Sequence, residues 1–291
     1  MGLMNTAITL VGILLIMVGL RDMFHQLLHP PSHGSLSRGV FSVVWRMSRV
    51  MKHRLGTAVG PGAMVLVIVL WVLLQVFGWA LVYLPHVPED FSYSDADPTR
   101  YPDFADALYV SLVTLATLGF GDVVAVDPVL RLVTPLQGLT GFALLTASLT
   151  WFIQIYPPLS RRRALAMSLN GMKHSRFAQR LADLQPAVAA VALEQLTRDI
   201  AQSCIDFNQY GETYYFREQH ADLSLARYLP YTLEIRAAAG ASTSPDVQLS
   251  GERFGFALQK LSEKLSHEFL SGNTPQEVFA AYAADHRAHQ R

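Results

Sequence analysis

Three long apolar runs, separated by polar segments, dominate the pattern of the chain. They lie at residues 3–20, 64–84 and 132–156 and contain almost no ionisable side chains. A helix rises about 1.5 Å per residue, so about 20 apolar residues cross a hydrocarbon core of about 30 Å. The pattern therefore predicts three transmembrane helices.

The first run is the shortest of the three, and a short apolar run is also typical of a secretory signal peptide. Two features favour a retained helix. No Lys or Arg precedes the run, and the residues that follow it, Arg21-Asp22-Met23-Phe24-His25, offer no small-residue cleavage site.

Residues 38–53 have the spacing of an amphipathic helix. Basic side chains at every third position resemble a voltage-sensor helix, but the segment is too short and too polar to span a bilayer. We expect it to lie on the membrane surface, with its basic face toward anionic lipid headgroups. The polar face is Arg38, Ser42, Arg46, Arg49, Lys52 and His53, and the apolar face is Val40, Val43, Val44, Met47, Val50 and Met51.

Charges on the connecting segments predict the orientation. Basic residues dominate between the first and second runs, and Arg161-Arg162-Arg163 follow the third, whereas acids dominate after the second run. Cytoplasmic segments carry the excess of Lys and Arg. We therefore expect a multi-pass protein of the cell membrane, of the bacterial inner-membrane type, with an outside amino terminus and a cytoplasmic carboxyl-terminal module.

The chain turns polar after residue 156. Pro157-Pro158 predicts the end of the third helix, because proline lacks a backbone N–H. Thr274-Pro275-Gln276-Glu277 has the capping residue, proline and glutamate of a helix start. Residues 240–245 are expected to form a loop. Other helices are expected from their periodicity at 162–184, 186–207, 224–239 and 251–270.

These patterns predict an all-α membrane protein in three parts. Residues 1–62 hold the first transmembrane helix and the interfacial helix, residues 63–156 a pore domain, and residues 157–291 a cytoplasmic helical module. Composition agrees, because 51% of the residues are hydrophobic and 16% are charged, which is too apolar for a wholly soluble protein. The formal net charge of +0 predicts no nucleic-acid partner.

The segment between the second and third runs carries the candidate chemistry. Residues 104–117 have the length of a short helix, and Thr-Leu-Gly-Phe-Gly-Asp follows at 117–122. A segment this short must enter and leave the membrane on one side, and such irregular backbone is tolerated only inside protein or beside water. Gly119 and Gly121 reach positive φ without strain, so that successive carbonyls can point the same way.

This arrangement resembles the pore of the potassium channel family, whose filter reads Thr-Val-Gly-Tyr-Gly, commonly followed by Asp. The resemblance covers about residues 64–156. It implies passive K⁺ conduction through a homotetramer, because one filter cannot enclose an axis, and K⁺ as permeant ion without another cofactor. K⁺ is then held by Thr117, Leu118, Gly119 and Phe120, the filter includes Gly121, and Asp122 lies at the outer mouth.

The third run contains a candidate gate. By the resemblance, Gly141 stands where these channels often place a hinge glycine, and Leu145, Leu149 and Ile153 follow at a spacing of four. This stripe either lines the inner vestibule and closes it by dewetting or packs against neighbouring helices. The sequence leaves both interpretations open.

Departures from the family pattern leave a weakly selective cation channel as an alternative. Phe120 lacks the tyrosine hydroxyl that could tether the filter. Val113 stands where some bacterial members have a carboxylic acid, so Asp122 lacks that partner.

Other classes are less favoured. The histidines of the module are scattered without metal-ligand spacing, and no nucleophile or dinucleotide-binding motif stands out, so we do not expect an enzyme. A membrane-anchored signalling protein and a transporter subunit are the remaining alternatives. We expect the module to assemble or regulate the pore, coupling an unknown cytoplasmic ligand or lipid signal through Arg161-Arg162-Arg163 to Gly141, with no voltage sensor.

Overall fold

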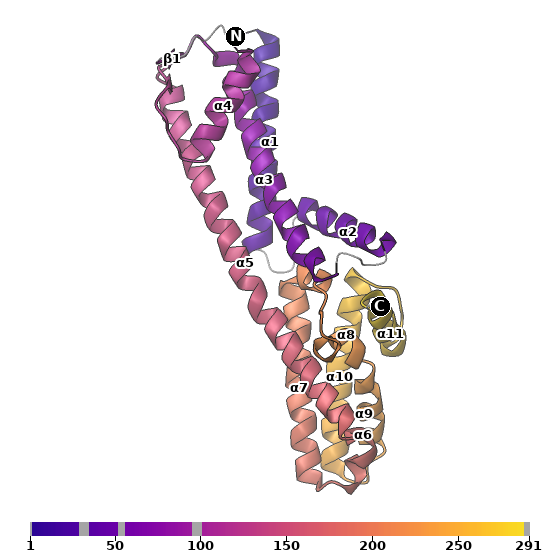
Figure 1. The fold of residues 1–291 in the computed structure, drawn as a ribbon. Helices are drawn as coiled ribbons and strands as arrows, with labels where there is room; N and C mark the ends of the chain where they lie inside the picture. Colours follow the sequence, from indigo (N-terminus) through magenta and orange to yellow (C-terminus); the bar gives the residue numbers. More distant parts are fainter. Residues whose placement is uncertain (1, 29–34, 52–55, 95–100, 288–291) are drawn as a thin grey trace. The chain divides into compact units, whose positions relative to one another are not determined.

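The computed structural model describes residues 2–28, 35–51, 56–94 and 101–287 (Figure 1). Helices make up most of the described chain, which confirms the all-α class, and the two strands found there are three residues long. The chain divides into two compact units. The membrane unit is Met1–Val40 with Met64–Ile153, and the module unit is Phe41–Ala63 with Gln154–Arg291.

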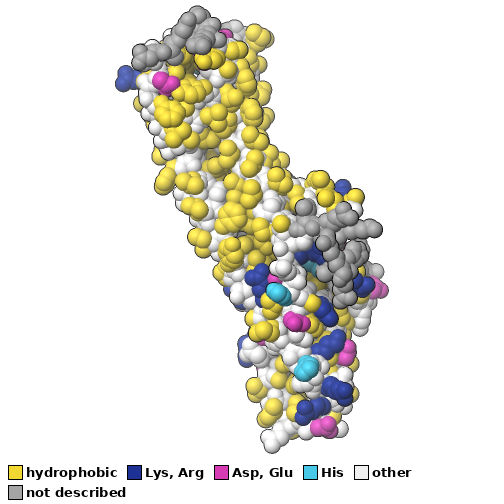
Figure 2. Space-filling view, in the orientation of Figure 1, with side chains coloured by type: hydrophobic (Ala, Val, Ile, Leu, Met, Phe, Trp, Pro, Cys, Tyr) yellow, Lys and Arg dark blue, Asp and Glu magenta, His cyan; other side chains and the backbone are white. Residues whose placement is uncertain are grey.

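The three predicted transmembrane helices are confirmed. They are α1 (Leu3–Leu28), α3 (Val59–Tyr83) and α5 (Leu130–His174). Each belongs to a helical segment that is long and apolar enough to cross a bilayer. In Figure 2 the membrane unit presents mainly hydrophobic side chains, whereas charged side chains gather on the module.

Helices α1 and α3 meet at glycines. A Cβ atom added at Gly12 would lie 2.5 Å from the carbonyl oxygen of Gly78, and one added at Gly78 would lie 2.7 Å from Cγ1 of Ile16. Gln75 Nε2 donates a hydrogen bond of 3.1 Å to the carbonyl of Ile16. Small residues let membrane helices approach closely, so α1 and α3 pack tightly against each other at these positions.

A buried carboxylate joins α1 to the amphipathic helix α2 (Ser35–Val50). Asp22 is 4% exposed. Its Oδ1 accepts from the backbone N–H of Leu36 at 3.0 Å, and its Oδ2 accepts from Ser37 Oγ at 2.5 Å and from Trp71 Nε1 at 2.9 Å. The first N–H groups of a helix have no intrahelical partner, so Asp22 caps α2. The ring of Trp71 in turn packs against Trp151 of α5, with centroids 5.4 Å apart.

The predicted end of the third helix at Pro157-Pro158 is wrong, because α5 continues unbroken to His174. Each proline removes one helical hydrogen bond, at a cost of about 3 kcal/mol. Beyond the prolines, Leu159, Leu165 and Leu169 are each 2% exposed or less, and this burial offsets the cost. Residues 52–53, predicted as the end of the amphipathic helix, lie outside the described residues.

The module is a helical bundle. Its core joins α5 and α7 (Pro186–Gln209) to α10 (Pro245–Glu268) and α11 (Pro275–Asp285). The start of α11 is as predicted, because Thr274 Oγ1 accepts from the N–H of Glu277. The remaining helical elements are α6 (Phe177–Arg180), α8 (Leu225–Tyr228), α9 (Tyr231–Gly240), η1 (Gly56–Ala58), η2 (Leu84–His86), η4 (Leu181–Asp183), η5 (Gly211–Tyr215) and η6 (Ala221–Leu223).

Three helices of the module differ from the prediction. The helix expected over 224–239 is divided into α8 (Leu225–Tyr228) and α9 (Tyr231–Gly240) by a turn at residues 229–230. The helix expected over 162–184 is interrupted after His174, where Arg176 adopts a left-handed φ of 54°. The helix expected over 251–270 begins earlier, at Pro245, because proline at the first helical position has no N–H to leave unpaired. The loop expected at 240–245 is confined to residues 241–244.

Candidate functional site

The short helix that precedes the filter is α4 (Asp103–Leu115). It packs in an apolar cluster with residues of α1, α3 and the start of α5, through Ala107 and Val110. The chain leaves its last turn directly into the filter, because the N–H of Thr117 donates to Thr114 O at 3.0 Å and that of Leu118 to Val113 O at 2.9 Å. The helix predicted over 104–117 is thus confirmed, two residues shorter at its end.

Every second residue of the filter has a left-handed backbone. The φ angles are 55° at Thr117, 56° at Gly119 and 80° at Gly121. The sequence predicted positive φ for the two glycines but not for Thr117, where a side chain makes it cost about 1–2 kcal/mol. Such alternation allows successive carbonyls to point to one side of the strand, as a stack of oxygen rings requires.

The outer end of the filter is tethered on two sides. The hydroxyl of Tyr109, on α4, donates to Oδ2 of Asp122, and the N–H of Ser94 donates to the Asp122 carbonyl at 2.8 Å. Strand β1 (Phe91–Tyr93) pairs antiparallel with β2 (Val123–Ala125), which directly follows the filter. The sequence indicated that position 113 holds valine and not an acid that could contact Asp122. It did not identify Tyr109, one turn earlier on the same face of α4, as the partner of Asp122.

A buried polar network holds α4 against its neighbours. Gln137 of α5 is 0% exposed, and its Nε2 donates to the carbonyl and hydroxyl oxygens of Ser111 at 2.8 and 2.9 Å. Its Oε1 accepts from the Tyr83 hydroxyl at 2.7 Å, and Ser111 Oγ donates to Val76 O at 2.8 Å. Sequence reasoning missed this network, although a glutamine within an apolar span is the signal that could have found it.

Gly141 lies where α5 passes the end of α4. A Cβ atom there would be 2.0 Å from the carbonyl oxygen of Leu115. Gly141 is therefore required for close packing beneath the filter, and its predicted role as a hinge stays a prediction. Further along α5, the side chains of Leu145, Leu149 and Ile153 are 58%, 57% and 70% exposed in the single chain. That face is free either to line a vestibule or to pack against another subunit, so both interpretations stay open.

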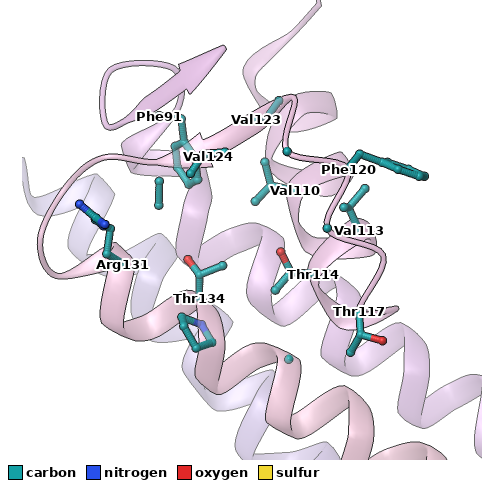
Figure 3. A pocket seen from close by; sticks show the side chains of 15 residues that line it. Phe91, Val110, Val113, Thr114, Thr117, Phe120, Val123, Val124, Arg131 and Thr134 are labelled. Atoms are coloured by element: carbon teal, nitrogen blue, oxygen red, sulfur yellow. The ribbon is translucent and has the colours of Figure 1, made fainter. Parts of the chain in front are cut away.

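An open cavity of about 500 Å³ lies beside the filter (Figure 3). Its wall combines aliphatic side chains with the hydroxyls of Thr114 and Thr134 and with Arg131 near the start of α5. The filter side chains Leu118 and Phe120 are 58% and 66% exposed. An apolar surface of this kind next to the filter fits contact with another chain.

Comparison with known proteins agrees with the site. Residues 67–156 match the model of a family described as an ion channel, which confirms the predicted resemblance for that segment. Over 177 residues the chain is 26% identical to the uncharacterized membrane protein YdjJ of Bacillus subtilis, and the match covers 59% of this chain and 50% of that protein. The chain thus spans about half the length of this relative. No solved structure matches. With the three apolar helices, these findings indicate a membrane protein in which residues 67–156 are similar to an ion-channel family.

Proposed function

Because residues 67–156 match an ion-channel family, we propose that four copies of the chain form a potassium-selective channel. The observation that carries the proposal is the alternating left-handed backbone at Thr117, Gly119 and Gly121. In the proposed tetramer, carbonyls of Thr117, Leu118, Gly119 and Phe120 replace the water shell of K⁺ as it passes, driven only by its gradient.

The single filter in each chain supports assembly of several copies, because one filter cannot form a ring of oxygens around an axis. The exposed filter side chains and the open cavity beside them support this step. Neighbouring subunits would cover Leu118 and Phe120 and would fill part of the cavity.

Strict selectivity is favoured over weak selectivity by the tethers around the filter. Phe120 lacks a hydroxyl, but Tyr109 holds Asp122, and Gln137 fixes α4 to α3 and α5. A backbone held at both ends is less free to collapse around the smaller Na⁺. The alternative, a weakly selective cation channel, predicts that these tethers have no effect on the Na⁺ to K⁺ ratio.

The proposed orientation places the start of α1 and the filter mouth outside and the module in the cytoplasm of a bacterial cell. The basic residues of α2 and of α5 support it. The module is proposed to regulate the pore rather than to catalyse a reaction. Arg161 pairs with Asp206 at 2.6 Å, and Arg162 and Arg163 both contact Glu218, at 3.1 and 2.8 Å, so the module holds α5 directly after its membrane span.

The proposal is tested by K⁺ flux from vesicles that contain the purified full chain. Gly119→Ala is compared with Gly62→Ala, because a Cβ meets nothing within 4 Å at either glycine and positive φ is found only at Gly119 of the two. We expect Gly119→Ala to lose K⁺ flux at least tenfold while Gly62→Ala conducts normally. Equal flux in the two variants would contradict a conducting role for the filter backbone.

A further inference from the structure

Helix α2 presents two opposite faces with different surroundings. Phe41, Trp45 and Ser48 are 2%, 3% and 0% exposed, whereas Met47 and Val50 are 58% and 80% exposed. At 100° per residue these two sets lie about half a turn apart. Val43, 53% exposed, and Met51, 45% exposed, extend the open face.

The buried face is occupied by the module. The ring of Phe41 stacks on Tyr215 with centroids 5.3 Å apart, and Trp45 Nε1 donates to Asp285 Oδ2 at 3.0 Å. Arg49 Nε lies 3.1 Å from Oδ1 of the same aspartate. The module therefore does not explain the aliphatic side chains on the opposite side of α2. The sequence missed this division, because it treated the helix as having a single apolar face.

The open face is flanked by positive charge. Arg38 and Arg46 are exposed, and the helix contains no acid in its sequence, whereas the exposed Arg49 pairs with Asp285 of the module. A surface that joins exposed aliphatic side chains to exposed arginines fits the boundary of a bilayer, where acyl chains and anionic headgroups meet. A protein partner of ordinary surface composition would leave the arginines without matched charge.

The start of α2 is tied to the membrane. Asp22, near the end of the membrane-spanning helix α1, caps it through the N–H groups of Leu36 and Ser37. The same carboxylate accepts from Trp71 of α3, whose ring packs on Trp151 of α5. The first turn of α2 is thus held at the end of α1 by a carboxylate that also contacts α3.

We propose that the open face of α2, made of Val43, Met47 and Val50 and extended by Met51 directly after the helix, with Arg46 beside them, binds the interface of an anionic lipid membrane. The aliphatic side chains enter the acyl-chain boundary, and the arginines contact phosphate groups of the lipids. The helix is then held between lipid on one side and the module on the other. This inference does not depend on which ion the pore conducts.

The test uses the full chain with Cys204→Ala, labelled with a small fluorophore at Met47→Cys, in vesicles of phosphatidylcholine with or without phosphatidylglycerol. Lipids that carry a nitroxide near the headgroup end of the acyl chain act as quenchers. We expect at least twofold quenching at Met47→Cys in the phosphatidylglycerol vesicles. A label at Val191→Cys, an exposed apolar site on α7, should stay unquenched.

The contribution of the arginines to lipid binding is tested by introducing Arg46→Gln into the labelled protein. This change should reduce the quenching at residue 47 by at least half in phosphatidylglycerol vesicles, whereas Arg198→Gln, at an exposed position on α7, should not. Quenching that is equal in the two lipid mixtures would overturn the anionic partner. Absence of quenching would overturn the lipid surface, and disulfide cross-linking of the unlabelled Met47→Cys protein would then assign this face to contact with a second copy.

Discussion

The membrane unit and the module secure their buried polar groups in different ways. In the membrane unit, Gln137 and Ser111 form neutral hydrogen bonds between helices. In the module, the poorly exposed carboxylates of Asp206 and Glu218 pair with arginines of α5. Lipid offers no hydrogen bonds, so each polar group there needs a fixed neutral partner, whereas beside water Arg161 and Arg163 can keep part of their hydration. Neutral hydrogen bonds thus hold α4, the helix that precedes the filter, and ion pairs hold the module to α5.

The largest expected effect tests the close packing on which the membrane unit depends. Gly141→Ala places a methyl group against the Leu115 carbonyl, and such overpacking costs about 1–3 kcal/mol or more. We expect K⁺ flux to be lost and the thermal midpoint in detergent to fall.

The matched control for this prediction is Gly138→Ala, about one turn earlier on α5, where a Cβ meets nothing within 4 Å. It should fold and conduct as the parent does. If both alanine variants behave alike, close packing of Gly141 against the end of α4 is not needed for conduction.

The next effect concerns the ion pairs of the module. Glu218→Gln removes the charged partner of Arg162, whose side chain is 6% exposed, and a buried charge left unpaired costs about 3 kcal/mol. Chemical unfolding of the full chain in detergent should show this loss. Glu263→Gln, which removes an exposed pair with Lys260, should leave the unfolding midpoint unchanged; equal losses would argue against the buried pair.

Breaking the neutral hydrogen-bond network around Gln137 should cause a somewhat smaller loss of stability. Gln137→Leu leaves the buried Tyr83 hydroxyl without its acceptor, at a cost of about 1–3 kcal/mol. Permeability to Na⁺ relative to K⁺ should also rise, because α4 loses a tether. Thr146→Val removes an exposed hydroxyl that bonds only within its own helix and serves as the control. An unchanged permeability ratio in Gln137→Leu would show that the network does not act on the filter.

The smallest effect is a pH dependence of the module. His286 packs against the rings of Tyr214, Tyr282 and Trp45, and removal from water lowers its pKa from 6.5 to about 4. Between these values the unfolded chain binds more protons, so stability should fall as the pH falls from about 6.5 towards 4. In a plot of the free energy of unfolding against pH, His286→Gln should flatten this region, and His220→Gln should not. A profile unaltered by His286→Gln would assign the dependence to other groups.

Local signals in the sequence predicted most of what is local in the fold. Composition fixed the three spans, the capping residues at Thr274 and Glu277 marked the start of α11, and the two filter glycines indicated positive φ. Each of these depends on neighbours along the chain.

The rest depends on contacts between distant residues, which a single sequence does not contain. The partners of Asp22 come from two other helices, α2 and α3, and Tyr83 meets Gln137 only once α3 and α5 are packed. The continuation of α5 past Pro157-Pro158 depends likewise on burial of Leu159 and later residues in the module. Local propensity opposed that continuation, and tertiary packing decided it.

The most direct test of the central claim is the reversal potential of the purified full chain in a planar bilayer, with K⁺ on one side and Na⁺ on the other. A potassium-selective filter at 117–121 predicts reversal far toward the K⁺ equilibrium potential and no current from Gly119→Ala. Reversal near zero, or selective current that survives Gly119→Ala, would contradict it.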